Sequence, residues 1–309
     1  MSGLRVRHDL DSGFSVLDGE IELFRYVYVP DTVQLESPKP YVHPLRTRAG
    51  HLVSLFRPHD HVWHKGISWS LPVVGDENFW GGPTYVHGQF YVQLDNDGTQ
   101  RHVDVDEIAV DDDSARFAHD LTWITQDGRT LFSEHRTLEA RIVDAGTWVL
   151  TVGIAMTNVS DDDISIGSPT TRGRENAGYG GLFWRGPRSF TGGTAVTAAG
   201  AAAGDDLRGQ RHEWMGFAGR HDGEDSESLI VIVDDAANPR HPPQWFVRSE
   251  EFAALNPAPF FSEELVVAAG ETVMFRYAVA VSDSGVAAAG DVARAARERL
   301  SQAAPGARQ

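Results

Sequence analysis

The sequence contains no cysteine, which removes disulfides, thiolate nucleophiles and cysteine metal sites together. Any metal would therefore need histidine and carboxylate ligands. The absence of cysteine also favours a cytoplasmic location, and residues 1–11 lack an apolar core of signal-peptide length. No run approaches the roughly 20 apolar residues that a membrane helix needs. We therefore expect a soluble, cytoplasmic protein that does not contact membranes.

Positive charge is scarce, with 27 Lys and Arg against 44 Asp and Glu and a formal net charge of −17. A nucleic-acid backbone or an anionic membrane would be repelled over most of such a surface, so neither is expected as a partner. The chain of 309 residues is long enough to bury a large core, as one all-β unit or as two ordinary domains. Composition leaves the oligomeric state open.

Helical periodicity is also scarce, and alternation at period two dominates. The clearest strand is Thr147–Thr157, where large apolar residues alternate with small or polar ones. Residues 117–123 and 131–141 read as a hairpin closed at Asp127-Gly128. In its second strand Glu134 and Arg136 share one face, and we expect them to be satisfied or solvent-facing. Further strands are expected at Glu20–Val29, His51–Phe56, Gln89–Leu94, Leu229–Val233 and Val273–Val281.

The only convincing helical pattern runs from Ser284 to Leu300, with arginines toward its C-terminal end. Gly192–Gly209 is rich in Gly and Ala and reads as a long surface loop. The sequence therefore predicts an all-β protein, a large antiparallel β-sandwich with a short C-terminal helix. We expect one domain over residues 1–300 and a flexible tail over residues 301–309.

The block from Pro58 to Gly66 gathers His59, Asp60, His61, His64 and Lys65 just after an apolar run. An extended segment would place His59 and His61 on one face, and a bend would bring His64 beside them. Three interpretations stay open: a metal-free polar site in which an imidazole is acid or base, a divalent metal held by the three histidines, or surface histidines. Lys65 would repel a cation, and it would also keep His64 neutral and available as a base.

Two short segments flank this block. His43 and Arg46 can reach the same end of the sheet as His61, where the guanidinium would offer a donor fork to ligand oxygens; a surface turn is the alternative. Trp80, beside a Gly-Gly-Pro turn, suits a platform on which a sugar ring stacks or a loop pinned to the core.

A second polar segment, Thr171–Arg185, spreads charged and aromatic residues among glycines, as in a shaped loop. Glu175 is its candidate for a second acid/base group. Alternatively, Arg172 and Arg174 hold Glu175 in a structural ion pair. Ligand contacts are also expected from this segment, at Arg174, Asn176 and Trp184.

The sequence Tyr41-Val42-His43-Pro44, the histidine block and Phe79-Trp80 resemble the bacterial family labelled methane oxygenase PmoA. That label implies an oxygenase, although a membrane methane-oxidising complex would need spans that this chain lacks. The last strands, around Phe260-Phe261, Ala269–Thr272 and Phe275-Arg276-Tyr277, are similar to galactose-mutarotase-like supersandwich domains. That resemblance implies a sugar site on one concave sheet, with histidine and glutamate as acid and base.

We therefore expect a carbohydrate-active enzyme, an epimerase, lyase or hydrolase, that uses His61 or His64 with Glu175. Trp80 or Trp184 would stack on the sugar, and the other substrate contacts would come from His43, Arg46, His59, Asp60, Lys65, Arg174 and Asn176. No cofactor is expected. The alternatives are a non-catalytic carbohydrate-binding protein and a metalloenzyme with the ligands His59, His61 and His64.

Overall fold

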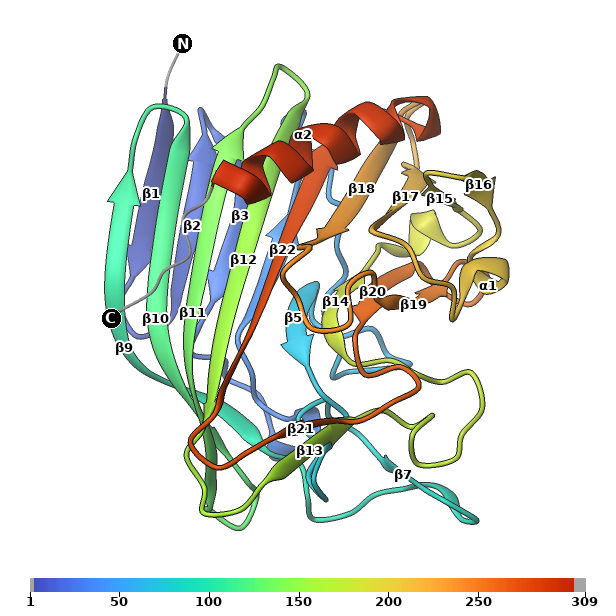
Figure 1. The fold of residues 1–309 in the computed structure, drawn as a ribbon. Helices are drawn as coiled ribbons and strands as arrows, with labels where there is room; N and C mark the ends of the chain where they lie inside the picture. The colour runs from blue at the N-terminus through green and yellow to red at the C-terminus, as the bar shows by residue number, and fades with distance from the viewer. Residues whose placement is uncertain (1–2, 303–309) are drawn as a thin grey trace.

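The computed structural model describes residues 3–302, which form two large antiparallel sheets packed as a sandwich (Figure 1). We call them the front sheet, which carries the cavity described below, and the back sheet, which lies nearer the viewer in Figure 1. The front sheet contains, in spatial order, β1 (Leu4–Asp9), β2 (Gly13–Asp18), β3 (Ile21–Val27), β4 (Tyr41–Leu45), β5 (Ile67–Ser70), β14 (Gly181–Arg185), β20 (Ala254–Ala258) and β19 (Gln244–Arg248). The back sheet contains β16 (Gly200–Ala202), β15 (Thr194–Thr197), β17 (Trp214–Arg220), β18 (Glu227–Asp234), β22 (Thr272–Ser282), β12 (Thr147–Asn158), β11 (Thr130–Ile142), β10 (Ser114–Ile124) and β9 (Thr99–Val110).

Smaller elements lie beyond the two sheets. Two minor sheets are formed by β21 (Leu265–Val267), β13 (Ile164–Gly167) and β6 (Val73–Val74), and by the hairpin of β7 (Thr84–Val86) and β8 (Phe90–Val92). The helical segments are α1 (Gly204–Leu207), α2 (Ala289–Gln302) and the 3-10 turns η1 (Gln34–Glu36), η2 (Arg188–Phe190) and η3 (Val286–Ala288). None of the helices within residues 3–302 is long and apolar enough to cross a membrane.

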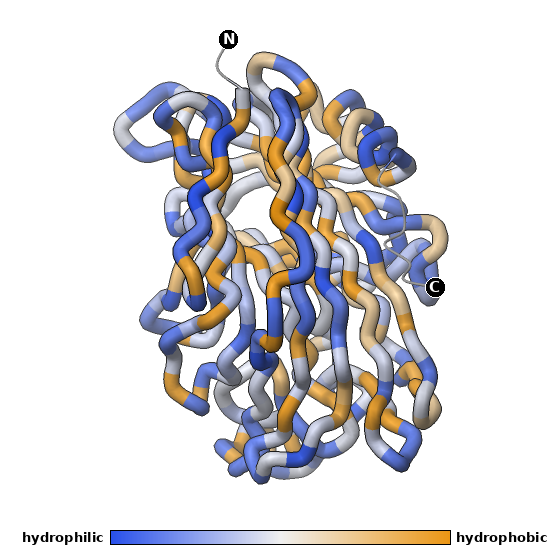
Figure 2. Tube along the Cα trace, turned by 90° about the vertical axis from the view of Figure 1, so that its left-hand side faces the viewer, coloured by the Kyte–Doolittle hydropathy of each residue, from blue (hydrophilic) through white to orange (hydrophobic). Residues whose placement is uncertain are grey.

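Strand β12 shows how the sequence builds the layers. Its large apolar residues, from Trp148 to Met156 at every second position, point into the core between the sheets. Val149 lies on the opposite face, where it packs with the buried side of α2. Hydropathy accordingly alternates along the strands (Figure 2). The predicted sandwich with one short C-terminal helix is confirmed, whereas the single domain over residues 1–300 stays a prediction.

Three boundaries differ from the sequence prediction. Gly192–Gly209, expected to be a loop, forms β15, β16 and α1 at the edge of the back sheet. His51–Phe56 is no strand, because its amides bond in turn to different partners, Val53 to Leu45 and Leu55 to Arg185. Helix α2 extends to Gln302 and so takes in the start of the predicted tail; residues 303–309 lie outside the described residues.

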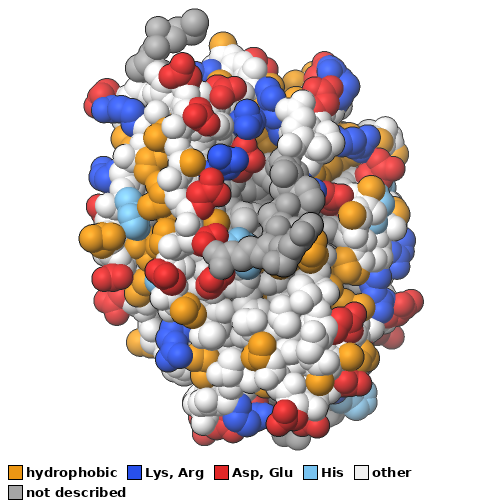
Figure 3. All heavy atoms as spheres, turned by 60° about the vertical axis from the view of Figure 1, so that its left-hand side comes forward, with side chains coloured by type: hydrophobic (Ala, Val, Ile, Leu, Met, Phe, Trp, Pro, Cys, Tyr) orange, Lys and Arg blue, Asp and Glu red, His pale blue; other side chains and the backbone are white. Residues whose placement is uncertain are grey.

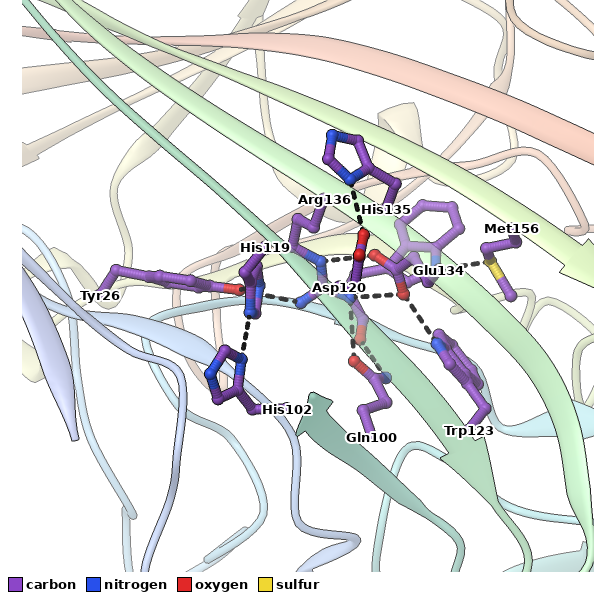
Figure 4. A network of polar contacts seen from close by, with 11 residues as sticks. Tyr26, Gln100, His102, His119, Asp120, Trp123, Glu134, His135, Arg136 and Met156 are labelled. Carbon is purple, nitrogen blue, oxygen red and sulfur yellow. Dashed lines mark hydrogen bonds and ion pairs between the residues drawn. The ribbon is translucent and has the colours of Figure 1, made fainter. Parts of the chain in front are cut away.

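A buried polar network crosses the core between the sheets (Figure 4). The guanidinium of Arg136 donates to both carboxylate oxygens of Glu134, at 2.6 and 2.9 Å, and to Gln100 at 3.0 Å. The indole of Trp123 donates to Glu134 at 2.7 Å. Glu134 and Arg136 are thus satisfied as expected, but they are buried and do not face solvent. Their hydrogen bonds offset the cost of burying two charges.

Candidate functional site

A cavity of about 540 Å³ opens on the outer face of the front sheet, a volume typical of small-molecule sites. Its walls come from the histidine block, the loop after Trp80, strand β8, the loop before β14, and the strand β19 with the segments beside it. The lining residues are His61, Trp63, His64, Trp80, Gly81, Pro83, Tyr91, Arg174, Glu175, Asn176, Ala177, Tyr179, Phe183, Arg208, Phe246, Arg248, Glu251 and Phe252.

Strand β14 sends alternate side chains to the two faces of the front sheet. Phe183 points outward into the cavity, and Arg185 lies on the same outer face, beneath the histidine block. Trp184 points inward: it is fully buried in the sandwich core, and its indole donates to the carbonyl of Val53 at 2.8 Å. Trp184 therefore does not line the cavity, and the predicted stacking platform is left to Trp80.

Two consecutive turns shape the histidine block. The amide of His61 donates to Pro58, and the amide of His64 donates to His61, each at 3.0 Å. A spacing of three residues through such turns brings the rings of His61 and His64 face to face, with centroids 4.6 Å apart and planes inclined by 8°. The block is therefore not extended as expected. His59 points elsewhere, outside the cavity, and contacts Arg188 at 2.9 Å.

Different partners fix the protons of the two stacked rings. The Asp60 carboxylate is an acceptor, so His61 Nδ1, 3.0 Å away, carries the hydrogen and leaves Nε2 as a free acceptor. A guanidinium can only donate, so His64 Nδ1 accepts from Arg185 at 3.0 Å and the proton of a neutral His64 lies on Nε2. One imidazole can thus accept a proton, while the other donates a hydrogen bond.

The charges around the rings reinforce this arrangement. Burial lowers the pKa of His61 against the opposing effect of Asp60. Burial, then the neighbouring His61 and Arg185, hold the pKa of His64 well below its usual range. Burial would raise the pKa of Asp60, but hydrogen bonds from His61 and Arg185 outweigh it and keep that carboxyl ionised. Both imidazoles are therefore neutral near pH 7.

The loop before β14 supplies charged groups from another side of the cavity. Glu175 is exposed there and makes no hydrogen bond or ion pair with any residue from 3 to 302. Its neighbours are engaged elsewhere: Arg172 contacts Glu264 at 3.5 Å, and Arg174 lies over the ring of Tyr91 at 4.7 Å. The alternative of a structural ion pair around Glu175 is therefore wrong. The carboxylate is free to meet a ligand.

Aromatic rings form much of the remaining wall. Trp80 packs against Tyr179 and Phe183, with centroids 4.7 and 4.8 Å apart, and its edge meets His64 at 5.6 Å. Together with Phe252 these rings form an apolar cluster separate from the sandwich core. Lys39 holds the backbone of Trp80, because its buried ammonium donates to the carbonyl of that residue at 2.8 Å. The cavity therefore combines apolar walls with a few oriented polar groups.

Four other predicted site residues lie outside the cavity, and the first of them, Asp60, bonds instead to His61 and Arg185. His43 contacts the hydroxyl of Ser54 at 2.8 Å, and burial followed by the charge of Arg46 lowers its pKa to about 4. Arg46 itself lies 3.9 Å from Glu22. Lys65 is fully buried and bonds to the carboxylate of Glu36, which makes it a structural ion-pair partner and not a cavity residue. The expected effect of Lys65 on His64 comes instead from burial, His61 and Arg185.

The residues do not fit the metal site that the oxygenase label would imply. Within the part of the chain that the structure describes, no group of three or more His, Asp or Glu side chains could hold a metal ion. His59 lies outside the cavity, and the Nδ1 atoms of His61 and His64 are already engaged.

Sequence reasoning missed several residues of the cavity, above all Arg208, Arg248 and Phe252. Phe246 and Arg248 share the outer face of β19 and alternate with core residues, but this pattern is also that of any strand with one exposed face. Phe252 follows that strand in a bend. No motif links these positions to the histidine block, so only the fold brings them together.

Comparison with solved structures finds distant similarity to carbohydrate-active enzymes. An α-galactosidase from Lactobacillus brevis has 11% identity and a TM-score of 0.39, over 91% of this chain and 40% of that chain. A mutant of the heparan sulfate lyase HepC from Pedobacter heparinus has 7% identity and a TM-score of 0.38, over 92% and 36%. An aldose epimerase homologue from C. elegans has 9% identity and a TM-score of 0.30, over 93% and 100%. This chain thus spans less than half of the galactosidase and of the lyase.

No functionally curated protein matches the sequence. One family model does match, over residues 14–297, and it describes a family of unknown function, DUF6807. The resemblance to the PmoA-labelled family stays a prediction. Since the match covers most of the chain, this protein belongs to the DUF6807 family of unknown function.

Proposed function

We propose that this protein is a carbohydrate-active enzyme that transforms a sugar or sugar derivative by acid–base chemistry, with His61 as the base. The observation that carries the proposal is the pair of hydrogen bonds that gives two stacked imidazoles opposite roles. Asp60 leaves His61 Nε2 as an acceptor, and Arg185 leaves His64 Nε2 as a donor. A base oriented by a carboxylate is a recurrent arrangement for proton transfer near neutral pH.

The walls of the cavity support a sugar as the ligand. Pyranose rings present C–H faces that pack on aromatic rings and hydroxyls that need hydrogen-bond partners. Trp80, Tyr179 and Phe246 offer the aromatic surfaces, and Asn176 and Arg174 offer polar groups on the same cavity. A volume of about 540 Å³ is sufficient for one or two sugar rings.

In this mechanism His61 Nε2 takes a proton from the sugar. His64 Nε2–H donates a hydrogen bond to the oxygen on which negative charge develops, as a preorganised donor does. Glu175, which has no other partner among the described residues, exchanges the second proton from the loop before β14. Epimerisation and elimination both begin with this proton transfer and differ in which bond of the substrate breaks next. In hydrolysis His61 would instead take its proton from the attacking water, and Glu175 would serve the leaving oxygen.

The test is turnover by matched histidine variants. Sugars and glycosides are incubated with the protein in D₂O and followed by NMR. Deuterium entering a C–H position identifies epimerisation through carbon, a new alkene proton identifies elimination, and a new reducing end without either identifies hydrolysis. His61→Gln should lower turnover by about two to four orders of magnitude, the range usual for an acid/base group, and should retain sugar binding. His59→Gln, two residues away but outside the cavity, is the control and should leave turnover unchanged.

Two results would contradict the proposal. Turnover by His61→Gln at the rate of the unmodified protein would remove His61 as the base. Sugar binding without turnover of any sugar by the unmodified protein would favour the alternative, a non-catalytic carbohydrate-binding protein.

A further inference from the structure

Three arginines, Arg174, Arg208 and Arg248, line the same cavity although the chain as a whole carries a formal charge of −17. On the side of the molecule seen in Figure 3, acidic side chains are spread over the surface with Lys and Arg among them. The lining also includes the carboxylates of Glu175 and Glu251, so the three arginines give the cavity a local excess of positive charge where the proposed substrate would bind. Like charges repel, so such a group is costly unless a ligand of opposite charge is present.

The guanidiniums keep donors available for a ligand. Arg248 uses one terminal nitrogen for Glu251, and Arg174 uses one for the hydroxyl of Tyr91. Arg208 donates from Nε to the carbonyl of Val247 at 3.1 Å and from one terminal nitrogen to Asp205. Each guanidinium has five N–H donors. Every one of the three therefore retains N–H groups without a partner within residues 3–302.

The carboxylates that accompany these arginines are weakly held. Asp205 and Glu251 each lie three residues from their arginine, and 55% and 72% of their side chains are exposed, against 14% for Arg208 and 22% for Arg248. Exposed ion pairs of this kind contribute little. Arg174 makes no ion pair with any described carboxylate. Arg208 and Arg248 are thus set in the wall of the cavity, whereas Asp205 lies outside it and Glu251, although it lines the cavity, is largely exposed to solvent.

Aromatic rings hold the guanidiniums in place. Arg208 and Arg248 lie over the ring of Phe246 at 5.3 and 5.8 Å, and Arg248 also lies over Phe252 at 5.3 Å. Burial lowers the pKa of Arg208, and the charges of Arg248 and Arg174 lower it further, against the effect of Asp205. The three cations are therefore close enough to affect one another, and a shared anion would relieve their repulsion.

We infer that the sugar bound in this cavity is anionic, with a carboxylate, phosphate or sulfate group held by Arg174, Arg208 and Arg248. The inference rests on the proposed function and adds its substrate class. Planar guanidiniums match the oxygen atoms of such groups in bidentate geometry, and an ammonium would not. The aromatic walls and the histidine pair then contact the sugar ring.

The test compares matched sugars by titration calorimetry: glucose, glucuronate and glucose 6-phosphate, then galactose and galacturonate. At least one anionic sugar should bind more than about 10-fold tighter than its neutral parent, and added salt should weaken only the anionic one. Arg248→Gln should lower that affinity by about 10- to 100-fold and leave the affinity for the neutral parent unchanged, whereas Arg174→Gln should weaken both ligands and the anionic one more. Arg220→Gln removes the same charge from an exposed site outside the cavity and should change neither.

The outcomes separate the two proposals. Neutral sugars bound as tightly as their anionic partners would overturn the anionic substrate and leave the sugar enzyme standing. No binding of any sugar by the unmodified protein would overturn both. Inorganic phosphate bound as tightly as glucose 6-phosphate would overturn the sugar part of the inference. Preference for the uronates over the phosphate would identify a carboxylate as the anion, and the reverse would identify a phosphate.

Discussion

Replacement of Glu36 by glutamine should destabilise the protein, because this buried carboxylate anchors the histidine block. Its oxygens accept from Arg57 at 2.6 to 3.1 Å and from the ammonium of Lys65. Lys65 is fully buried, and among residues 3–302 its ammonium meets, besides Glu36, only the carbonyl of Val62, at 3.3 Å, and the ring of Phe56. Glu36→Gln would therefore leave a buried ammonium without its counter-ion.

The expected cost follows from that uncompensated charge. Removing one partner of a buried ion pair typically costs about 3–5 kcal/mol of unfolding free energy. For a chain of 309 residues, the usual unfolding entropy converts this cost into a melting temperature lower by about 5–8 °C. Glu20→Gln is the matched control, because it breaks an ion pair with Arg5 in which 97% of the glutamate side chain is exposed, and it should melt with the unmodified protein.

The pH dependence gives a second readout. Burial would raise the pKa of Glu36, but hydrogen bonds from Arg57 and Lys65 outweigh it and hold that pKa below its ordinary value of 4.5. A carboxylate with a lowered folded pKa stabilises above its unfolded pKa, and this contribution is lost as the pH falls further. The difference between Glu36→Gln and the unmodified protein should therefore shrink as the pH drops below about 4.5.

A double variant tests whether the unpaired ammonium of Lys65 causes the loss of stability. Adding Lys65→Met to Glu36→Gln removes the stranded ammonium and should recover part of the lost stability. Scanning calorimetry of the four proteins gives the comparison. The reasoning is refuted if Glu36→Gln melts within a degree of Glu20→Gln at pH 7, because the buried pair would then contribute nothing.

Three further outcomes are expected. His61 and His64 should remain neutral to below pH 6.5 in an NMR titration of their ring protons. A histidine whose pKa is lowered by folding destabilises the folded protein as the pH falls through the pKa of the unfolded chain, so the free energy of unfolding should decline below about pH 6.5. A pKa of 6.5 for His64 would disprove the effect of burial. His43→Gln should cost only about 1 kcal/mol, the value of its hydrogen bond to Ser54, with turnover unchanged; turnover reduced as in His61→Gln would place His43 in the site. Trp184→Ala should cost about 3–5 kcal/mol in denaturant unfolding while the folded fraction keeps its sugar affinity, and lost affinity at full stability would contradict the inward position of the indole.

The layers of the sandwich and part of the candidate site could be predicted from the sequence. Alternation at Thr147–Thr157 gave the core face correctly, because polar residues mark the other face of that strand. In Gly181–Arg185 every residue is buried, Arg185 on the outer face included, so no alternation of buried and exposed positions separates the two faces of this strand. A shift of one residue exchanges the two faces, and the indole was therefore assigned to the wrong side.

Residues whose partners are distant in sequence could not be assigned either. Lys65 stands inside a histidine block, which suggests a ligand contact, but its partner Glu36 lies 29 residues earlier in a 3-10 turn. No period or motif connects the two positions. Arg208 and Arg248 likewise meet the cavity only because α1 and β19 are adjacent in the fold.

The two stacked histidines receive their hydrogen-bond partners in different ways, one from the adjacent residue and one from a distant strand. Asp60 precedes His61 directly, so the partner that makes His61 an acceptor is written into the block itself. His64 receives its partner from Arg185, which lies 121 residues away on β14. That strand can present a guanidinium beneath the block only because Phe183 and Arg185 share its outer face. The base is thus defined by the loop, whereas the hydrogen-bond donor beside it exists only once the front sheet has formed.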